Sequence, residues 1–71
     1  MDRTPVKSRT IKSVGYEPVK EILEVEFLDD SVYQYSPVPP LVYGEFISAS
    51  SYGTYMDEAI KTAGYVEKKL S

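Results

Sequence analysis

The sequence predicts a single α+β domain, in which a three-stranded antiparallel meander is followed by two short helices packed on one face of the sheet. Apolar side chains alternate at Leu23, Val25 and Phe27, the two-residue period of a strand with one buried face. The proline-rich residues 36–40 cannot continue such a sheet, but prolines suit the first turn of a helix. A chain of 71 residues has no room for a second core. The expected order is therefore β-β-β-α-α.

The three strands are expected over residues 9–16, around residues 23–28 and over residues 32–35. The first carries Ile11, Val14 and Tyr16, which fit strict alternation poorly, so we expect a bulge or twist near Gly15. Residues 29–31 are Asp, Asp and Ser, which suit a tight hairpin. Residues 1–8 are polar and contain a proline, so we predict a flexible lead-in followed by a single domain over residues 9–71.

The first helix is predicted over residues 41–50, with Val42, Phe46 and Ala49 on one apolar stripe. Thr54 is expected to cap the second helix, and Asp57 stands three residues later, as in a capping box. Gly64 suits the end of this helix. The following residues 65–70 are expected to dock back on the sheet as a short terminal segment.

Cysteine and histidine are both absent, which excludes disulfides and the usual zinc-ligand spacings. No apolar run reaches the roughly 20 residues that a bilayer requires, and the first residues lack the pattern of a signal peptide. We therefore expect a soluble, cytoplasmic protein with no metal, no cofactor and no membrane partner.

Catalysis is not expected, because the commonest general base is missing and no spacing pairs a serine or tyrosine with an activating group. Two acidic pairs, at residues 29–30 and 57–58, would suit a hard cation or acid-base work. A hairpin turn and the first turn of a helix explain the same residues through their backbone hydrogen bonds. A small hydrolase remains a remote alternative.

Five short motifs occur in an order that resembles the KTSC domain family, over residues 8–66. They are Ile11-x-x-Val14-Gly15-Tyr16, Leu23-x-Val25-x-Phe27, Tyr33-Gln34-Tyr35, Val38-Pro39 and Ala49-x-Ser51-x-Gly53-x-Tyr55. The resemblance implies a small domain found alone in bacterial or phage-type proteins and at the C-terminus of some lysyl-tRNA synthetases, with RNA binding as the associated role. It implies no catalytic residue and no cofactor. Asp57 departs from the family's pattern, which favours Asn there.

Two groups of side chains are candidates for binding. The rings of Tyr33 and Tyr35 point to one face of a strand, where they either stack on nucleic-acid bases or fill the core beneath the helices. The turn between the helices gathers Ser51, Tyr52 and Tyr55, which either hold a small anion or peptide carboxylate or act only in capping and packing.

A basic surface is the third candidate, and it has to be assembled from both ends of the chain. Residues 21–60 hold eight acidic residues and no basic one, and Glu24 and Glu26 would repel a phosphate backbone. One patch forms only if the first strand and the last segment lie side by side, and its members would be Arg9, Lys12, Lys61, Lys68 and Lys69. The sequence thus predicts a non-enzymatic binding module. RNA or tRNA is one candidate ligand, and a protein interaction or a small homodimer is the alternative.

Overall fold

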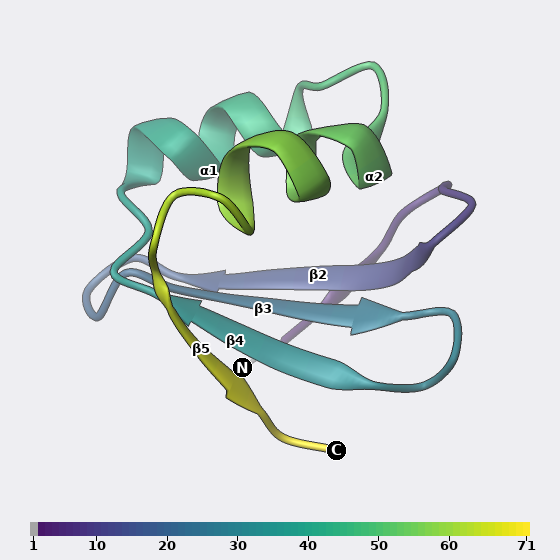
Figure 1. Cartoon of the computed structure of the whole chain (residues 1–71), viewed down its shortest axis with the longest axis horizontal. Helices are drawn as coiled ribbons and strands as arrows, with labels where there is room; N and C mark the ends of the chain where they lie inside the picture. Colours follow the sequence, from purple (N-terminus) through teal and green to yellow (C-terminus); the bar gives the residue numbers. More distant parts are fainter. Residues whose placement is uncertain (1) are drawn as a thin grey trace.

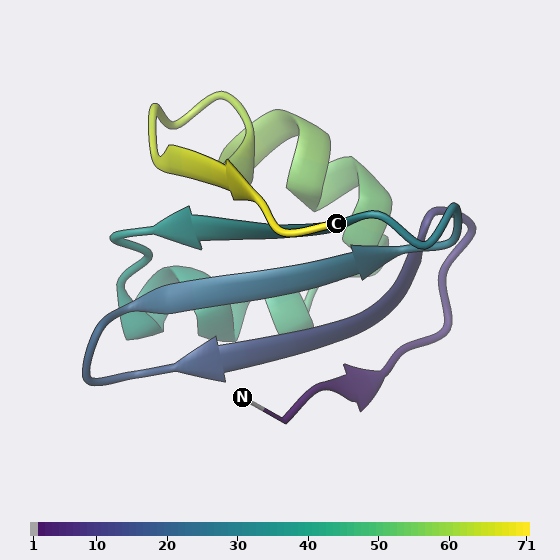
Figure 2. The same cartoon turned by 90° about the horizontal axis from the view of Figure 1, so that it is seen from below.

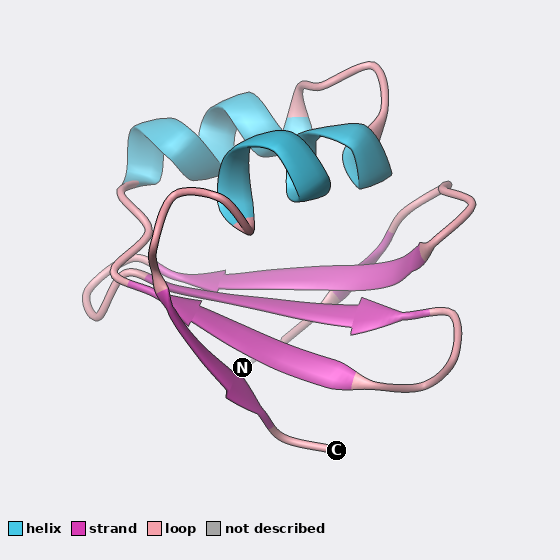
Figure 3. Ribbon diagram, viewed as in Figure 1, coloured by secondary structure: helices cyan, strands magenta, loops and turns pink. Residues whose placement is uncertain are grey.

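The computed structural model describes residues 2–71 and places them in two layers, a twisted sheet with helices over one face (Figure 1). Figure 3 shows this separation, with all the helical turns on the same side of the strands. The elements in chain order are β1 (Thr4–Pro5), β2 (Ile11–Glu17), β3 (Ile22–Phe27), β4 (Val32–Ser36), α1 (Pro40–Ile47), α2 (Tyr52–Tyr55), the π-helical turn η1 (Met56–Ile60) and β5 (Val66–Lys69).

The strands form one antiparallel sheet in the order β1-β2-β3-β4-β5, so every strand pairs with its neighbours in sequence. The α+β class, the antiparallel pairing and the helices on one face are as predicted. The number of strands is not, because the sheet has five strands and the prediction was three. Figure 2 shows the two additional strands, β1 and β5, at opposite edges of the sheet.

Neither edge strand was predicted as a strand, and the physical reasons differ, although residues 65–70 dock on the sheet as expected. All four residues of β5 are exposed, so the strand carries no alternation between buried and open positions. Strand β1 has two residues, one of them a proline, which sequence patterns place in loops. It lies inside the segment predicted as a flexible lead-in, while the flexibility of that segment and the domain boundary at residue 9 stay predictions.

Strands β2, β3 and β4 supply the sheet side of the core. Val14 pairs with Val25, and Val25 pairs in turn with Tyr33 of β4. Leu23 pairs with Tyr35, and both side chains are buried under the helices. The bulge in β2 falls between Ile11 and Ser13 rather than near Gly15, so the first strand changes register at its start.

Helix α1 begins with Pro40 at a position where its missing N–H costs nothing, and it buries Phe46 against the sheet. It ends at Ile47, three residues earlier than predicted. The next helix is capped by Ser51, whose Oγ accepts a hydrogen bond from the Thr54 N–H at 3.3 Å. The predicted cap at Thr54 is therefore wrong, because Ser51 satisfies the free backbone N–H groups one turn earlier.

Helix α2 continues directly into η1, where the Lys61 N–H donates to the Met56 carbonyl at 2.9 Å. This wider turn buries both Met56 and Ile60. These two residues complete the core. It consists of apolar and aromatic side chains from the central strands, from α1, from η1 and from the connection before α1: Ile11, Val14, Leu23, Val25, Tyr35, Val38, Phe46, Met56 and Ile60. None of the described helices is long and apolar enough to cross a membrane.

The helix-free face of the sheet carries a hydrogen-bonded polar network. Glu24 is 7% exposed and accepts hydrogen bonds from Arg3 Nη1 at 2.8 Å and from Gln34 Nε2 at 2.9 Å. Glu26 accepts a hydrogen bond from the Ser13 hydroxyl at 2.9 Å. The two glutamates predicted to repel phosphate are thus already bound to other side chains of the domain.

Candidate functional site

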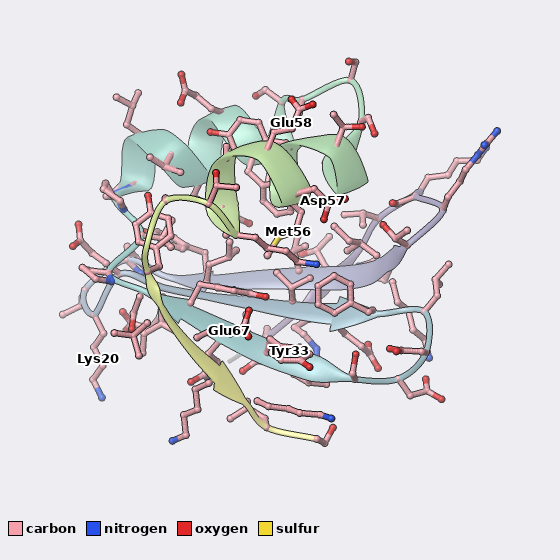
Figure 4. The ribbon with its side chains drawn as sticks, viewed as in Figure 1. Lys20, Tyr33, Met56, Asp57, Glu58 and Glu67 are labelled. Carbon is pink, nitrogen blue, oxygen red and sulfur yellow. The ribbon has the colours of Figure 1, made fainter. Side chains whose placement is uncertain are left out.

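The main concavity lies between η1 and strands β3, β4 and β5, with a volume of about 650 Å³. We call it the Tyr33 cleft, and its walls include Phe27, Tyr33, Tyr35, Met56, Lys61 and Glu67. Figure 4 shows Met56 and Asp57 on the helical side, with Tyr33 and Glu67 on the strands below. In the same view Glu58 points away from the sheet and Lys20 lies at the far turn.

Aromatic rings and cations meet at one end of this cleft. The rings of Phe27 and Tyr33 pack edge to face, with centroids 5.8 Å apart. The Lys61 ammonium lies 5.4 Å from the Phe27 centroid, and the Lys69 ammonium lies 6.0 Å from the Tyr33 centroid. Tyr33 is half-buried, so part of its surface is open to a ligand.

The two tyrosines of the Tyr-x-Tyr motif have different environments. Tyr35 is 2% exposed and belongs to the core, as the packing alternative predicted. Burial raises its pKa, and the nearby Glu67 carboxylate raises it further. Tyr35 therefore stays protonated at neutral pH, whereas Tyr33 packs against the core and also lines the cleft.

The five residues of the predicted basic surface do not lie along one edge. Strands β3 and β4 separate Lys12 on β2 from Lys68 and Lys69 on β5. Lys12 forms ion pairs with Asp30 at 3.3 Å and with Glu26 at 3.9 Å. The first strand and the last segment are not neighbours, which corrects the arrangement that one continuous patch required.

Three of the five basic residues nevertheless gather at the Tyr33 cleft. Arg9 and Lys61 line it, and Lys69 lies beside Tyr33. Lys68 pairs with Gln34 in the sheet, and alternation along β5 directs its side chain to the helix-free face. A ligand role for any of the five stays a prediction.

The turn between the helices borders a second hollow, of about 410 Å³, that includes Ser51 and Tyr52. Tyr55 lies elsewhere, with its ring centroid 5.8 Å from that of Phe46 and its hydroxyl donating to Glu45 Oε1 at 3.3 Å. Ser51 serves as the helix cap described above. These contacts explain Ser51 and Tyr55 structurally, while ligand binding at this turn stays a prediction.

Three carboxylates of the two acidic pairs, those of Asp29, Asp30 and Asp57, have structural partners. The Asp29 carboxylate accepts hydrogen bonds from the Ser31 N–H at 3.0 Å and the Ser31 hydroxyl at 2.6 Å, and these bonds lower the pKa of Asp29. Asp57 forms an ion pair with Lys61 at 3.4 Å. Within residues 2–71, no group of three acidic side chains is placed to hold a metal ion.

Two residues of the cleft, Phe27 and Glu67, were missed as site residues. Phe27 was predicted only as a strand residue, although its position before the hairpin places it beside Tyr33 through the strand pairing. Glu67 had no detectable signal, because its place in the cleft depends on β5 joining the sheet opposite Tyr35.

Comparison with known proteins identifies the family. The model of the KTSC domain matches residues 7–65, against the predicted resemblance over residues 8–66. The chain belongs to the KTSC domain family. A crystal structure of a KTSC domain protein from Yersinia pestis superposes with a TM-score of 0.93 at 37% identity, covering 99% of this chain and 97% of the other.

Related sequences occur both alone and within a larger enzyme. An uncharacterised protein of Stutzerimonas stutzeri is 37% identical over 65 residues, which is 92% of this chain and 92% of that protein. A lysine–tRNA ligase of Nostoc is 41% identical over 51 residues, which is 72% of this chain and 9% of the ligase. The predicted link between this family and lysyl-tRNA synthetases is thus confirmed.

Proposed function

We propose that this KTSC domain is a non-enzymatic binding module that binds single-stranded RNA, including the unpaired segments of a tRNA, at the Tyr33 cleft. The observation that carries the proposal is the placement of Arg9, Lys61 and Lys69 around the Phe27 and Tyr33 rings. Single-strand readers combine these two features, since rings stack on bases and cations neutralise phosphates.

The half-buried Tyr33 offers part of its ring to a ligand, while the rest packs against Phe27 and stacks on Tyr35, whose centroid is 6.4 Å away. Tyr33 is held between its neighbours on β3 and β5, because Val25 and Lys69 are its partners in the sheet. Stacking one base on such a ring contributes about 1–3 kcal/mol. Phosphates on either side of that base then lie within reach of the exposed Arg9, Lys61 and Lys69 side chains.

The relationship to the Nostoc ligase supports the same ligand class. That protein is named as a ligase that joins lysine to tRNA, and the matching segment amounts to 9% of its length. This similarity to part of a protein named for tRNA supports RNA as the ligand class for this chain. Binding of RNA also fits the cytoplasmic location expected from the sequence.

The test is fluorescence anisotropy with a labelled oligouridine RNA, titrated at several salt concentrations. Three phosphate contacts predict that the logarithm of the association constant falls with the logarithm of salt concentration with a slope of about −2. Lys69→Gln should reduce that slope by about 0.7 and weaken binding. Lys20→Gln, at the far turn, is the matched control and should leave both unchanged.

Absence of any anisotropy change at low salt, or equal effects of Lys69→Gln and Lys20→Gln, would reject RNA binding at this cleft. Tyr33→Leu adds a second readout, because it keeps an apolar side chain beside Phe27 and removes the stacking ring. It should weaken binding without changing the salt slope, since the cations remain.

A second candidate function, formation of a homodimer, is favoured by the outer edge of β5. In the sheet of the described chain this strand pairs with β4 alone, and Val66 at its start is 67% exposed. The free backbone N–H and C=O groups of such an edge can pair with a strand of another chain. The charged side chains of Lys68 and Lys69 disfavour that pairing. Light scattering in solution separates the two cases, because a dimer doubles the monomer mass of 8.0 kDa.

A further inference from the structure

The Tyr33 cleft contains acidic groups that a purely phosphate-binding surface would not need. Asp29 is bound to Ser31 and Asp57 is paired with Lys61, so both carboxylates have partners in the domain. Glu67 forms no ion pair among residues 2–71, and it also lines the cleft. Its carboxylate is therefore the acceptor available to a ligand.

The position of Glu67 is fixed by the sheet. It pairs with Tyr35 across β4 and β5, and both side chains lie on the helix-covered side. The protonated Tyr35 hydroxyl lies near the Glu67 carboxylate and takes at most one of its acceptor positions. An ionised carboxylate has about four such positions, so Glu67 retains acceptors for donors of a ligand in the cleft.

Hydrogen-bond donors lie on the helical side of the same cleft. Lys61 follows η1 directly, with its ammonium over the Phe27 ring, and Arg9, in the chain segment before β2, also lines the cleft. A ligand in the cleft therefore meets an acceptor on β5 and donors on the opposite wall. Tyr33 and Phe27 supply the ring surface between them.

We propose that the Tyr33 cleft selects guanine, with Glu67 accepting the N1–H and N2–H donors of the base while Lys61 or Arg9 donates to O6 and N7. This inference rests on the proposed binding of RNA. Guanine presents two adjacent donors on its Watson–Crick edge, and arginine or lysine is the commonest partner of its O6 and N7 acceptors. The base would stack on the open part of Tyr33.

The other bases fit this arrangement less well. Adenine and cytosine each place an acceptor beside their amino group, so a carboxylate that accepts one bond faces repulsion from the next atom. Uracil has a single N–H flanked by two carbonyl oxygens. Glu67 thereby acts as a specificity-determining residue. Its carboxylate favours the binding of guanine over that of the other bases, and it does not prevent the binding of RNA.

The test compares five-nucleotide RNAs that differ only at the central position of an oligouridine. The RNA with central guanosine should bind about tenfold more tightly than those with adenosine, cytidine or uridine. Inosine, which lacks the N2 amino group, should lose most of this advantage. Titrations are made by fluorescence anisotropy on the full chain, with circular dichroism to confirm that each variant is folded.

Glu67→Gln tests the residue, because an amide offers one acceptor and one donor in the same space. It should reduce the guanosine preference from about tenfold to about one, and removing a negative charge should leave oligouridine binding intact or slightly tighter. Glu58→Gln removes the same charge from the outer face of η1, away from the cleft, and should keep the preference.

The outcomes separate the two proposals. Equal binding of the four RNAs, or a guanosine preference that survives in Glu67→Gln, would overturn guanine selection and leave RNA binding standing. Failure of every RNA to bind at low salt would overturn both. A preference for guanosine that inosine and Glu67→Gln abolish, and that Glu58→Gln keeps, would establish the inference.

Discussion

The ion pair between Arg3 and Glu24 should hold the N-terminal segment to the helix-free face of the sheet. The side chain of Glu24 is 10% exposed and that of Arg3 is 30% exposed. The distance between Arg3 Nη1 and Glu24 Oε2 is 2.8 Å. A hydrogen bond to a charged group contributes about 1.5–3 kcal/mol when buried. Gln34 remains as a second donor to Glu24 and Arg3 is partly solvated, so the lower end of that range applies.

Arg3→Ala should therefore lower the free energy of unfolding by about 1.5 kcal/mol. In a domain of this size the thermal midpoint should fall by roughly 6–12 °C. The control is Lys7→Ala in the same segment. Lys7 is exposed and forms no ion pair among residues 2–71, so its loss should cost less than about 0.5 kcal/mol. Urea denaturation followed by circular dichroism measures both variants.

A double-mutant cycle with Glu24→Gln isolates the pair. In that background Arg3→Ala should cost about 0.5 kcal/mol or less, because the neutral amide no longer attracts the guanidinium and the contact that remains, with Glu26 at 3.9 Å, is longer. Equal losses for Arg3→Ala and Lys7→Ala, or the same cost of Arg3→Ala in both backgrounds, would show that this ion pair does not anchor β1. The flexible lead-in expected from the sequence would then describe the segment better.

Two further predictions concern pH and close packing. The pKa of Tyr35 in the folded protein is raised above its ordinary value of 10.0. The protonated hydroxyl therefore stabilises the fold fully below pH 10, and this stabilisation is lost as the pH rises above 10. In Tyr35→Phe the thermal midpoint should consequently fall less steeply at alkaline pH than in the unmodified protein. At Gly15 an added Cβ would lie 2.6 Å from the Asp2 backbone oxygen, so Gly15→Ala should cost about 1–3 kcal/mol in urea denaturation. Gly44→Ala, where nothing lies within 4 Å, should instead stabilise α1 by up to about 1 kcal/mol.

Sequence patterns predicted the parts of the fold whose side chains are sorted by burial. Alternation over β3 correctly predicted that Leu23 and Val25 face the core, although Phe27 is only half-buried and Glu24 on the other face is buried too. The helical stripe correctly predicted the burial of Phe46, but Val42 is only half-buried and Ala49 lies beyond the end of α1. All residues of the edge strands β1 and β5 are exposed. Their positions depend on backbone pairing rather than on side-chain burial, so no burial pattern in the sequence predicts them. The helix cap was misplaced because Ser51 and Thr54 both suit that role chemically.

The candidate site shows the same division. Tyr33 could be predicted as a candidate from the sequence, because it and Tyr35 point to the same face of a strand. Two such rings form either a binding surface or part of the core. Glu67 and the grouping of Lys69 with Lys61 depend on which edge β5 joins, and net charge along the chain gives no information about that choice. The sequence therefore predicted Tyr33 and the candidate cations, but neither the Phe27 ring, nor Glu67, nor the geometry that brings them together.

Strand β5 links the pairing of the sheet edge to the charges at the Tyr33 cleft in this small domain. Its four residues are exposed and add little to the hydrophobic core, but its backbone bonds to β4 cover an edge that would otherwise be unpaired next to Tyr33 and Tyr35. Because side chains alternate along a strand, Glu67 and Lys69 face the helices in this pairing, whereas Lys68 faces the other side of the sheet. A shift of β5 by one residue would exchange these faces and place Lys68 beside the tyrosines in their stead. The register of an edge strand without a buried residue thus decides which charges face the Tyr33 cleft.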